Sequence, residues 1–222
     1  MDEYKRETRH IVAILDLLGA SEIIKGPTSE INMNHIFEIF QSAKTDWIRV
    51  EHAPFVLHDL KFVTFSDNIV MALELPEELS QEEIKTREKD FITYISVFQG
   101  ASLRNMLLFR GGITIGQLYI NPTENLVWGK ALVEAHLLEE KTAIYPRVVL
   151  SSQFDGADVL TIARIIKDFD GMYFVDYFST IKEKFPEWIE YSKGRVQEKI
   201  EEYRGKERIM QKYKWLQHYI QQ

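Results

Sequence analysis

Two aspartates lie where predicted strands end. Asp16 lies near the end of the apolar run 10–17, and Asp67 lies in the short turn between the apolar runs 60–65 and 69–73. Carboxylates brought together from adjacent strands could hold Mg²⁺, which takes one or two carboxylates plus the phosphate oxygens of a substrate. Alternatively, Asp16 caps the following helix and Asp67 is an ordinary turn residue. The residue types alone leave both interpretations open.

Two further features could receive an anion near these aspartates. The segment 17–21, which begins with Leu17, Leu18 and Gly19, could present backbone N–H groups where a helix starts. Arg110 stands directly before a pair of glycines, and its forked guanidinium could bind a phosphate. A structural ion pair explains Arg110 equally well.

The remaining polar residues give weaker signals. Lys61 and Asp59 are two positions apart, so they share a strand face and could line a pocket, but solvated charges at a sheet edge are the default. The sequence contains no paired-histidine metal motif, no GxSxG and no phosphate-binding GxxxxGK[ST] loop. The C-terminal basic residues predict a solvated helix face rather than a nucleic-acid site; they are Lys206, Arg208, Lys212 and Lys214.

Alternation and helical periodicity predict the elements that position these residues. Strands and helices are mixed and hairpins are present, so the predicted class is α+β. Three glycines within 111–116 indicate that a ligand or another backbone approaches that strand closely. Residues 76–88 are predicted as a solvated stretch. The predicted strands are 10–17, 55–57, 60–65, 69–73, 108–120, 126–128, 145–150 and 172–177. The predicted helices are 20–25, 29–45, 89–107 and 131–141, followed after 181 by either a pair of helices broken near Gly205 or one long interrupted helix.

Composition excludes several classes of function. The chain has 222 residues, 45% of them hydrophobic, which excludes global disorder. It has no cysteine, so it has no disulfide framework, thiolate zinc site or cysteine nucleophile, and this fits a reducing cytoplasm. The formal net charge of −7 argues against nucleic-acid binding. No apolar run approaches the ~18–20 residues of a membrane span, and no signal peptide is evident, so we expect a cytoplasmic protein.

Taken in order, four motifs resemble those of the class III nucleotide cyclase catalytic domain. They are Ile14-Leu-Asp-Leu-Leu-Gly19, Phe65-Ser-Asp-Asn-Ile-Val70, Phe109-Arg-Gly-Gly-Ile-Thr-Ile-Gly116 and Trp128-Gly-Lys-Ala-Leu132. More narrowly, the segments 129–139, 143–148 and 168–175 resemble the bacterial Pycsar pyrimidine cyclases of anti-phage defence. The resemblance covers roughly residues 10–177, so we expect a catalytic domain over 1–180 and a C-terminal helical extension over 181–222.

The resemblance implies a ferredoxin-like antiparallel or mixed sheet flanked by helices, and a homodimer with composite active sites. It implies two Mg²⁺ or Mn²⁺ ions, held by Asp16, Asp67 and the carbonyl of Leu17. Arg110 matches a position where the family contacts the triphosphate. Lys61 falls where purine cyclases place a lysine that reads the base.

Three positions depart from the purine cyclases. Leu126 stands where those enzymes carry a polar base reader. Val133 and Leu137 stand where they carry the asparagine and arginine that stabilise the transition state, and neither side chain can donate a hydrogen bond. These departures make adenylate or guanylate cyclase activity doubtful.

The reaction that the resemblance implies is conversion of UTP to 3′,5′-cyclic UMP and pyrophosphate. In it the ribose 3′-oxygen attacks the α-phosphorus with the help of two metal ions. A cytidylate cyclase acting on CTP, and an inactive nucleotide-binding sensor module, are the alternatives. The resemblance implies a second messenger read by a separate effector protein.

Overall fold

The computed structural model describes residues 6–26, 59–154, 164–184 and 186–221, together with 34, 36 and 38. The strand expected over 55–57 lies outside these residues, as does almost all of the helix expected over 29–45. No helix in the described part is both long and apolar enough to cross a membrane.

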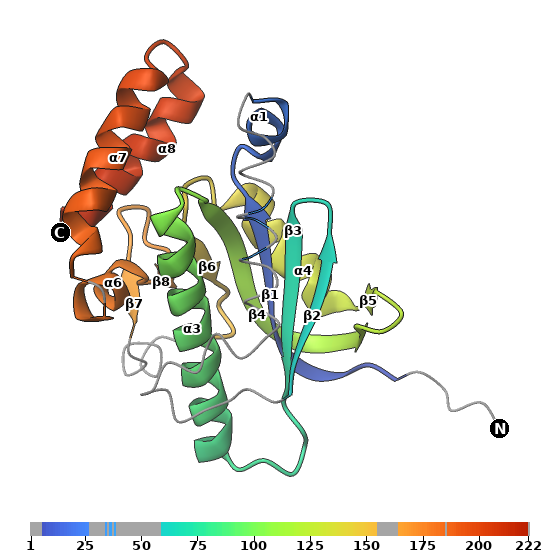
Figure 1. Cartoon of the computed structure of the whole chain (residues 1–222). Helices are drawn as coiled ribbons and strands as arrows, with labels where there is room; N and C mark the ends of the chain where they lie inside the picture. Colours follow the sequence, from blue (N-terminus) through green and yellow to red (C-terminus); the bar gives the residue numbers. More distant parts are fainter. Residues whose placement is uncertain are drawn as a thin grey trace.

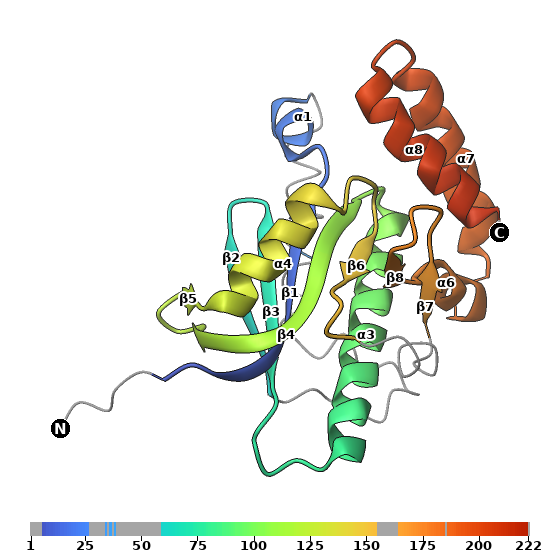
Figure 2. The same cartoon turned by 180° about the vertical axis from the view of Figure 1, so that it is seen from behind.

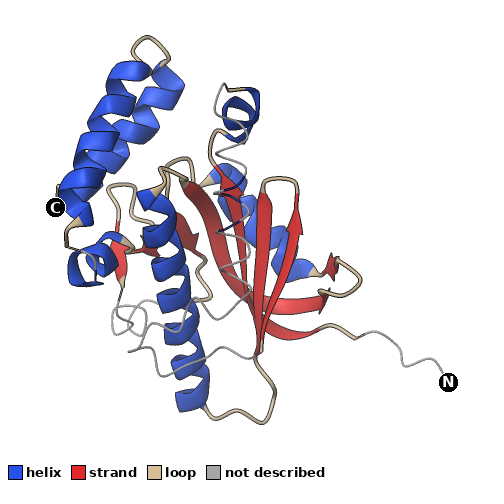
Figure 3. Cartoon of the chain, in the orientation of Figure 1, coloured by secondary structure: helices blue, strands red, loops and turns tan. Residues whose placement is uncertain are grey.

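Within the described residues, eight strands form one mixed sheet (Figure 1, Figure 3). The strand order is β2-β3-β1-β4-β6-β8-β7, and β5 pairs with β4 outside this path. Only the β4–β6 pairing is parallel among those described. The bounds are β1 Thr8–Leu17, β2 Leu60–Phe65, β3 Asn68–Glu74, β4 Phe109–Asn121, β5 Leu126–Trp128, β6 Val148–Leu150, β7 Ile165–Lys167 and β8 Tyr173–Val175.

Helices α3 (Gln81–Arg104) and α4 (Lys130–Lys141) cover opposite faces of this sheet (Figure 1, Figure 2). Side chains of β1 therefore alternate between two cores. Ile11, Ala13 and Leu15 belong to the core that includes residues of α3, whereas Val12 and Ile14 belong to the core that includes residues of α4. Burial on both faces explains why β1 is apolar without alternation.

Several predicted boundaries differ from the observed ones. Residues 76–88 are not a solvated loop throughout, because α3 begins at Gln81. The Ser80 hydroxyl accepts from the Glu83 backbone N–H, and the Glu83 carboxylate accepts in return from the Ser80 backbone, which makes a capping box. The strand expected over 145–150 begins at Val148, since Pro146 has no N–H to donate. Strand β7 was not predicted, because three residues carry no readable periodicity.

Gly111 and Gly112 of β4 allow close approach of the backbones of β1 and α4, rather than of a ligand. A Cβ on Gly112 would lie 2.5 Å from the Ala135 carbonyl oxygen, and one on Gly111 would lie 2.2 Å from the Ile14 carbonyl oxygen. Helix α4 and strand β1 therefore approach β4 more closely than any side chain permits. The contact between Gly112 and the Ala135 carbonyl sets the distance between α4 and the sheet.

The C-terminal segment contains α6 (Phe178–Lys184) and a helical hairpin of α7 (Trp188–Glu202) and α8 (Glu207–Ile220). The break between α7 and α8 includes Gly205, as expected, and the φ of Gly205 is 89°, in the left-handed region that favours glycine. Helix α8 packs through Trp215, Leu216 and Tyr219 into a core that also includes Phe174 of β8. The observed fold is thus α+β, with a mixed sheet between helices and additional helices at its C-terminus, as predicted.

Candidate functional site

The backbone brings Asp16 and Asp67 to one end of the sheet. Asp16 is opposite Asn68 in the β1–β3 register, and the Leu17 N–H donates to the Asp67 carbonyl oxygen at 3.1 Å. The turn carrying Asp67 is tight, with Ser66 at a φ of 55°. Figure 1 shows the β2–β3 turn and helix α1 (Ala20–Lys25) at this same end. Strand pairing alone makes the two aspartates neighbours.

Arg110 is the third residue at this end, because it is opposite Asp16 in the β1–β4 register. Its Nε donates to Asp16 Oδ2 at 2.8 Å, and its Nη2 lies 2.5 Å from Glu139 Oε1. The guanidinium therefore lies between two carboxylates from different elements. Both hypotheses for Arg110 remain compatible with this position, since an ion-paired arginine close to a carboxylate pair can also meet a phosphate.

Glu139 is a buried carboxylate near the end of α4, with a side chain only 4% exposed. Burial raises its pKa above the ordinary value, and the neighbouring Arg110 acts in the opposite direction. Its Oε2 also lies 3.3 Å from His136 Nδ1. Close packing of α4 on the glycines of β4 is what carries Glu139 to Arg110.

Helix α8 also carries a lysine whose pKa is perturbed. Lys212 is half-buried, and burial lowers its pKa below the ordinary value. The positive charges of Arg110 and Arg208 lower this pKa further, whereas the negative charge of Asp16 raises it.

Some backbone N–H groups of segment 17–21 already donate hydrogen bonds within the protein. The Leu17 N–H donates to Asp67, and the Leu18 N–H donates to the Leu108 carbonyl oxygen at 2.8 Å. Two of the three amides expected to receive an anion thus already have acceptors. Gly19, with a φ of 77°, turns the chain from β1 into α1.

Lys61 does not join this group within one chain. It lies four residues before the end of β2 at Phe65, which at about 3.3 Å per residue is roughly 13 Å along the strand from the turn that carries Asp67. Its Nζ donates to Glu74 Oε2 at 3.1 Å. Lys61, Asp59 and Arg87 line an open depression at that other end of the hairpin.

The carboxylates present suit a hard divalent ion that arrives with phosphates. Among the described residues, no group of three or more His, Cys, Asp or Glu side chains could hold a metal alone. Asp16 and Asp67 supply two carboxylates on adjacent strand ends, which is the number that Mg²⁺ commonly takes from a protein when substrate phosphates complete its shell. The two carboxylates match the number that Mg²⁺ or Mn²⁺ takes from a protein when other oxygen ligands complete its shell.

The three positions that depart from the purine cyclases carry exposed apolar side chains. Val133 and Leu137 lie one turn apart on α4 and are 59% and 40% exposed. Leu126 and Trp128 on β5 are also exposed. We call these four residues the α4–β5 apolar surface.

Glu139 and Lys212 received no role in the site from the sequence. Glu139 lies in the segment 129–139, but the sequence assigns it no partner. Helical periodicity does not show which residue outside α4 a given side chain contacts. Lys212 was grouped with a solvated basic face, whereas only Lys206, Arg208 and Lys214 are exposed. A signal for Lys212 was present, since it lies four residues before the buried Leu216 and so shares its helix face.

No family model matches the sequence, and no curated protein matches it either. Solved structures do match. The adenylyl cyclase CyaB from P. aeruginosa is similar with a TM-score of 0.51 at 14% identity, over 77% of this chain and 94% of that one. The guanylyl cyclase Cya2 has a TM-score of 0.48 at 14% identity, over 76% of this chain and 92% of that one. The fold therefore resembles that of class III cyclase catalytic domains.

Proposed function

We propose that this protein is a pyrimidine nucleotide cyclase that converts UTP to 3′,5′-cyclic UMP and pyrophosphate. The observation that carries the proposal is the meeting of Asp16, Asp67 and Arg110 at one sheet end in a cyclase-like fold. Carboxylates and a guanidinium at adjacent strand ends are the groups needed to bind a nucleoside triphosphate together with divalent ions.

In the proposed reaction the ribose 3′-oxygen forms a bond to the α-phosphorus while the bond to the β-phosphate oxygen breaks. The 3′-hydroxyl proton goes to solvent and pyrophosphate leaves. Asp16, Asp67 and the Leu17 carbonyl would hold two Mg²⁺ or Mn²⁺ ions. When bound, such ions lower the pKa of the attacking hydroxyl and neutralise charge on the phosphates.

Arg110 orients the phosphates and neutralises their charge, and Glu139 orients Arg110. The Arg110 guanidinium donates its remaining N–H groups to the phosphates, and the buried Glu139 keeps that guanidinium at the sheet end. Positioning and charge neutralisation supply most of the acceleration in phosphoryl transfer, so few side chains are needed.

A pyrimidine substrate is supported by the three departures from purine cyclases and by the resemblance to Pycsar cyclases. Leu126, Val133 and Leu137 cannot form the polar contacts that the purine enzymes use. CTP is the close alternative to UTP. In this proposal the cyclic nucleotide acts in anti-phage defence and is read by a separate effector protein.

A homodimer with composite sites is part of the proposal. The α4–β5 apolar surface includes Trp128, which is 71% exposed, and two exposed aliphatic side chains of α4. Exposed apolar patches of this kind are typical of protein interfaces.

A nucleotide-binding sensor without turnover is the second candidate. It is favoured by the aliphatic side chains of Val133 and Leu137, which cannot stabilise charge in a transition state. The presence of both Asp16 and Asp67 favours the enzyme instead, since a domain without turnover has less need of two metal carboxylates.

Incubation of the purified protein with each of ATP, GTP, CTP and UTP plus Mn²⁺, followed by chromatography, tests the proposal. We expect cyclic UMP and pyrophosphate in equal amounts from UTP. Cyclic product from CTP alone would change the substrate to CTP. Absence of any cyclic product from all four nucleotides, with nucleotide binding retained, would establish the sensor module.

A further inference from the structure

We propose that Arg147 is a positioning residue of the candidate site: it fixes the last turn of α4 against β4, so that Glu139 holds Arg110 in one orientation. Arg147 is fully buried and lies between the end of α4 and the start of β6. Where the proposal concerns phosphate, it rests on the proposed function, since Arg110 is the group that would receive the phosphates.

Two arginines share the carbonyl groups at the end of α4. The last carbonyls of a helix have no partner within the helix. Arg110 Nη1 donates to the Glu139 carbonyl oxygen at 3.4 Å, and Arg147 Nη2 donates to the Thr142 carbonyl oxygen at 3.1 Å. Positive charge is favourable here, because the C-terminal end of a helix carries the negative end of its dipole. The two guanidinium groups therefore hold the same turn of α4, one from β4 and one from the loop that follows the helix.

Arg147 also contacts β4 directly beside Arg110. Its carbonyl oxygen accepts from the Gly111 backbone N–H at 3.1 Å, next to the parallel pairing of Gly111 with Val148. Arg147 thus bonds to β4 through its backbone and to α4 through its side chain. These are the two elements whose separation decides whether Glu139 Oε1 reaches Arg110 Nη2, at 2.5 Å. A shift of Arg147 would therefore move Glu139 relative to Arg110.

Two carboxylates of the β7–β8 turn hold the Arg147 side chain in place. Its Nη1 donates to Asp168 and Asp170, and its Nη2 donates to Asp170 as well. The Arg147 side chain is only 1% exposed, and a buried charge that loses its partners is costly. The guanidinium is therefore fixed between the β7–β8 turn and the end of α4.

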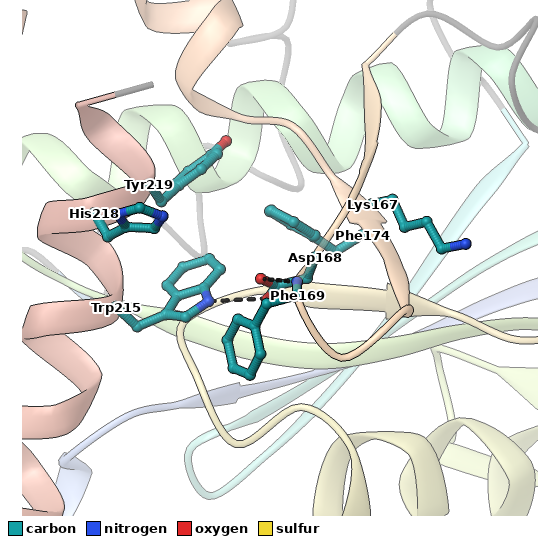
Figure 4. Close-up of a pocket in the computed structure, with 7 residues that line it drawn as sticks. All are labelled: Lys167, Asp168, Phe169, Phe174, Trp215, His218 and Tyr219. Carbon is teal, nitrogen blue, oxygen red and sulfur yellow. Dashed lines mark hydrogen bonds between the residues drawn. The ribbon is translucent and has the colours of Figure 1, made fainter.

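The C-terminal hairpin extends this chain of contacts. Trp215 Nε1 on α8 donates to Asp168 Oδ2 at 2.9 Å, as Figure 4 shows. The Trp215 indole also stacks on Tyr145, two residues before Arg147, with ring centroids 5.7 Å apart. Helix α8 thus supports both a carboxylate that pairs with Arg147 and the loop that carries Arg147. In this proposal the hairpin acts on the site through Arg147 rather than through a contact with substrate.

Hydrogen exchange at the Arg110 Nε–H tests the proposal without any nucleotide. This N–H donates to Asp16 Oδ2 at 2.8 Å, so its exchange rate, followed by ¹⁵N–¹H NMR of the full chain, reports how firmly the guanidinium is held. Arg147→Lys keeps the charge but replaces the fork by one nitrogen, which cannot reach the Thr142 carbonyl and the carboxylates at once. We expect the Arg110 Nε–H to exchange about tenfold faster in this variant, while the Val12 amide of β1 keeps its parental rate.

Trp215→Phe is the milder variant and decides the question if Arg147→Lys does not fold. It keeps an aromatic ring and removes only the hydrogen bond to Asp168, so we expect a smaller acceleration in the same direction. Trp188→Phe is the matched control, because Trp188 is half-buried on α7 and its ring lies under the Arg104 guanidinium. This control should leave the exchange unchanged.

Two results would overturn the proposal. One is a parental exchange rate at the Arg110 Nε–H in the folded variants of Arg147 and Trp215. The other is an equal acceleration at Arg110 and at the Val12 amide, which general destabilisation produces and a positioning role does not.

Titration of inorganic tripolyphosphate with Mg²⁺ into the same variants measures the consequence for the site. We expect about tenfold lower affinity in Arg147→Lys and parental affinity in Trp188→Phe, because a less ordered Arg110 loses more freedom when it binds phosphate. Parental affinity in Arg147→Lys would overturn the role of Arg147 in phosphate binding. A parent protein that does not bind tripolyphosphate would contradict the proposed function instead, and the exchange rates would still decide whether Arg147 positions Arg110.

Discussion

The side chains of Asp16 and Arg110 are directly joined: Arg110 Nε donates to Asp16 Oδ2 at 2.8 Å, although 94 positions separate the two residues. The β1–β4 register makes them opposite neighbours, and Glu139 holds the other side of the guanidinium. A metal ion or a phosphate that arrives at this sheet end meets an arginine already oriented by two carboxylates. The predictions below follow from this arrangement and from the packing that maintains it.

Asp16→Asn should abolish turnover while the fold is retained. Asparagine has the same shape but lacks the charge that a divalent ion requires, and loss of metal assistance costs at least about a hundredfold in rate. The measurement is cyclic nucleotide formation with Mn²⁺, beside circular dichroism. Glu190→Gln, which alters an exposed carboxylate on α7, is the control and should keep the parental rate. Parental turnover in Asp16→Asn would remove Asp16 from the metal site.

Glu139→Gln should weaken nucleotide binding through Arg110. The amide keeps the size of the side chain but removes one of the two charges that orient the guanidinium, so we expect KM to rise about tenfold. Glu140→Gln alters the next, exposed residue of α4 and should leave KM unchanged. Glu139→Asp, which keeps the charge, should recover part of the loss. If all three variants share the parental KM, Glu139 has only a packing role.

Gly112→Ala should lower the free energy of unfolding by about 1–3 kcal/mol, because its Cβ would overlap the Ala135 carbonyl oxygen. Gly194→Ala is the matched control within α7, where a Cβ meets nothing within 4 Å. Removing a helical glycine there should stabilise the protein by up to about 1 kcal/mol. Urea denaturation of both variants measures the contrast, and equal midpoints would show that α4 can move away from β4.

Asp170→Asn should reduce stability near neutral pH and lose its effect in acid. The hydrogen bond from Arg147 holds the pKa of Asp170 below its usual 3.8. A carboxyl whose pKa is lower in the folded state stabilises the protein above the unfolded pKa, and this contribution disappears as pH falls through the folded value. Urea denaturation from pH 7 to pH 3 should show the difference between parent and variant shrinking below about pH 4. A difference that is constant over this range would contradict the assignment.

Val133→Glu combined with Leu137→Glu should convert the proposed dimer into monomers. Two carboxylates on neighbouring turns of α4 place repelling charges on the α4–β5 apolar surface, and a second copy brings two more. Light scattering after size exclusion measures the change from twice the mass of one chain to the mass of one. Tyr191→Glu, at an exposed aromatic residue of α7, is the control and should leave the assembly intact.

The strands and the neighbourhood of the two aspartates were predictable from local patterns. An apolar run such as 10–17 predicts a buried strand, and a Ser-Asp-Asn turn between two such runs predicts a hairpin. Adjacent strands then bring Asp16 and Asp67 close through backbone pairing alone. The capping box at Ser80 was equally local, and the predicted start of α3 at residue 89 was wrong because the acidic first turn was taken for a loop.

The sequence by itself determined the fold class, the β2–β3 hairpin, the C-terminal helix pair and the positions of Asp16 and Asp67 at strand ends. Only the tertiary structure decided that the β4 glycines are contacted by α4 and β1, and that Glu139 holds Arg110. Periodicity shows which face of a helix is apolar, because that depends on residues three or four positions apart. It does not show which surface covers that face, since such contacts join residues dozens of positions apart and depend on how all the elements pack.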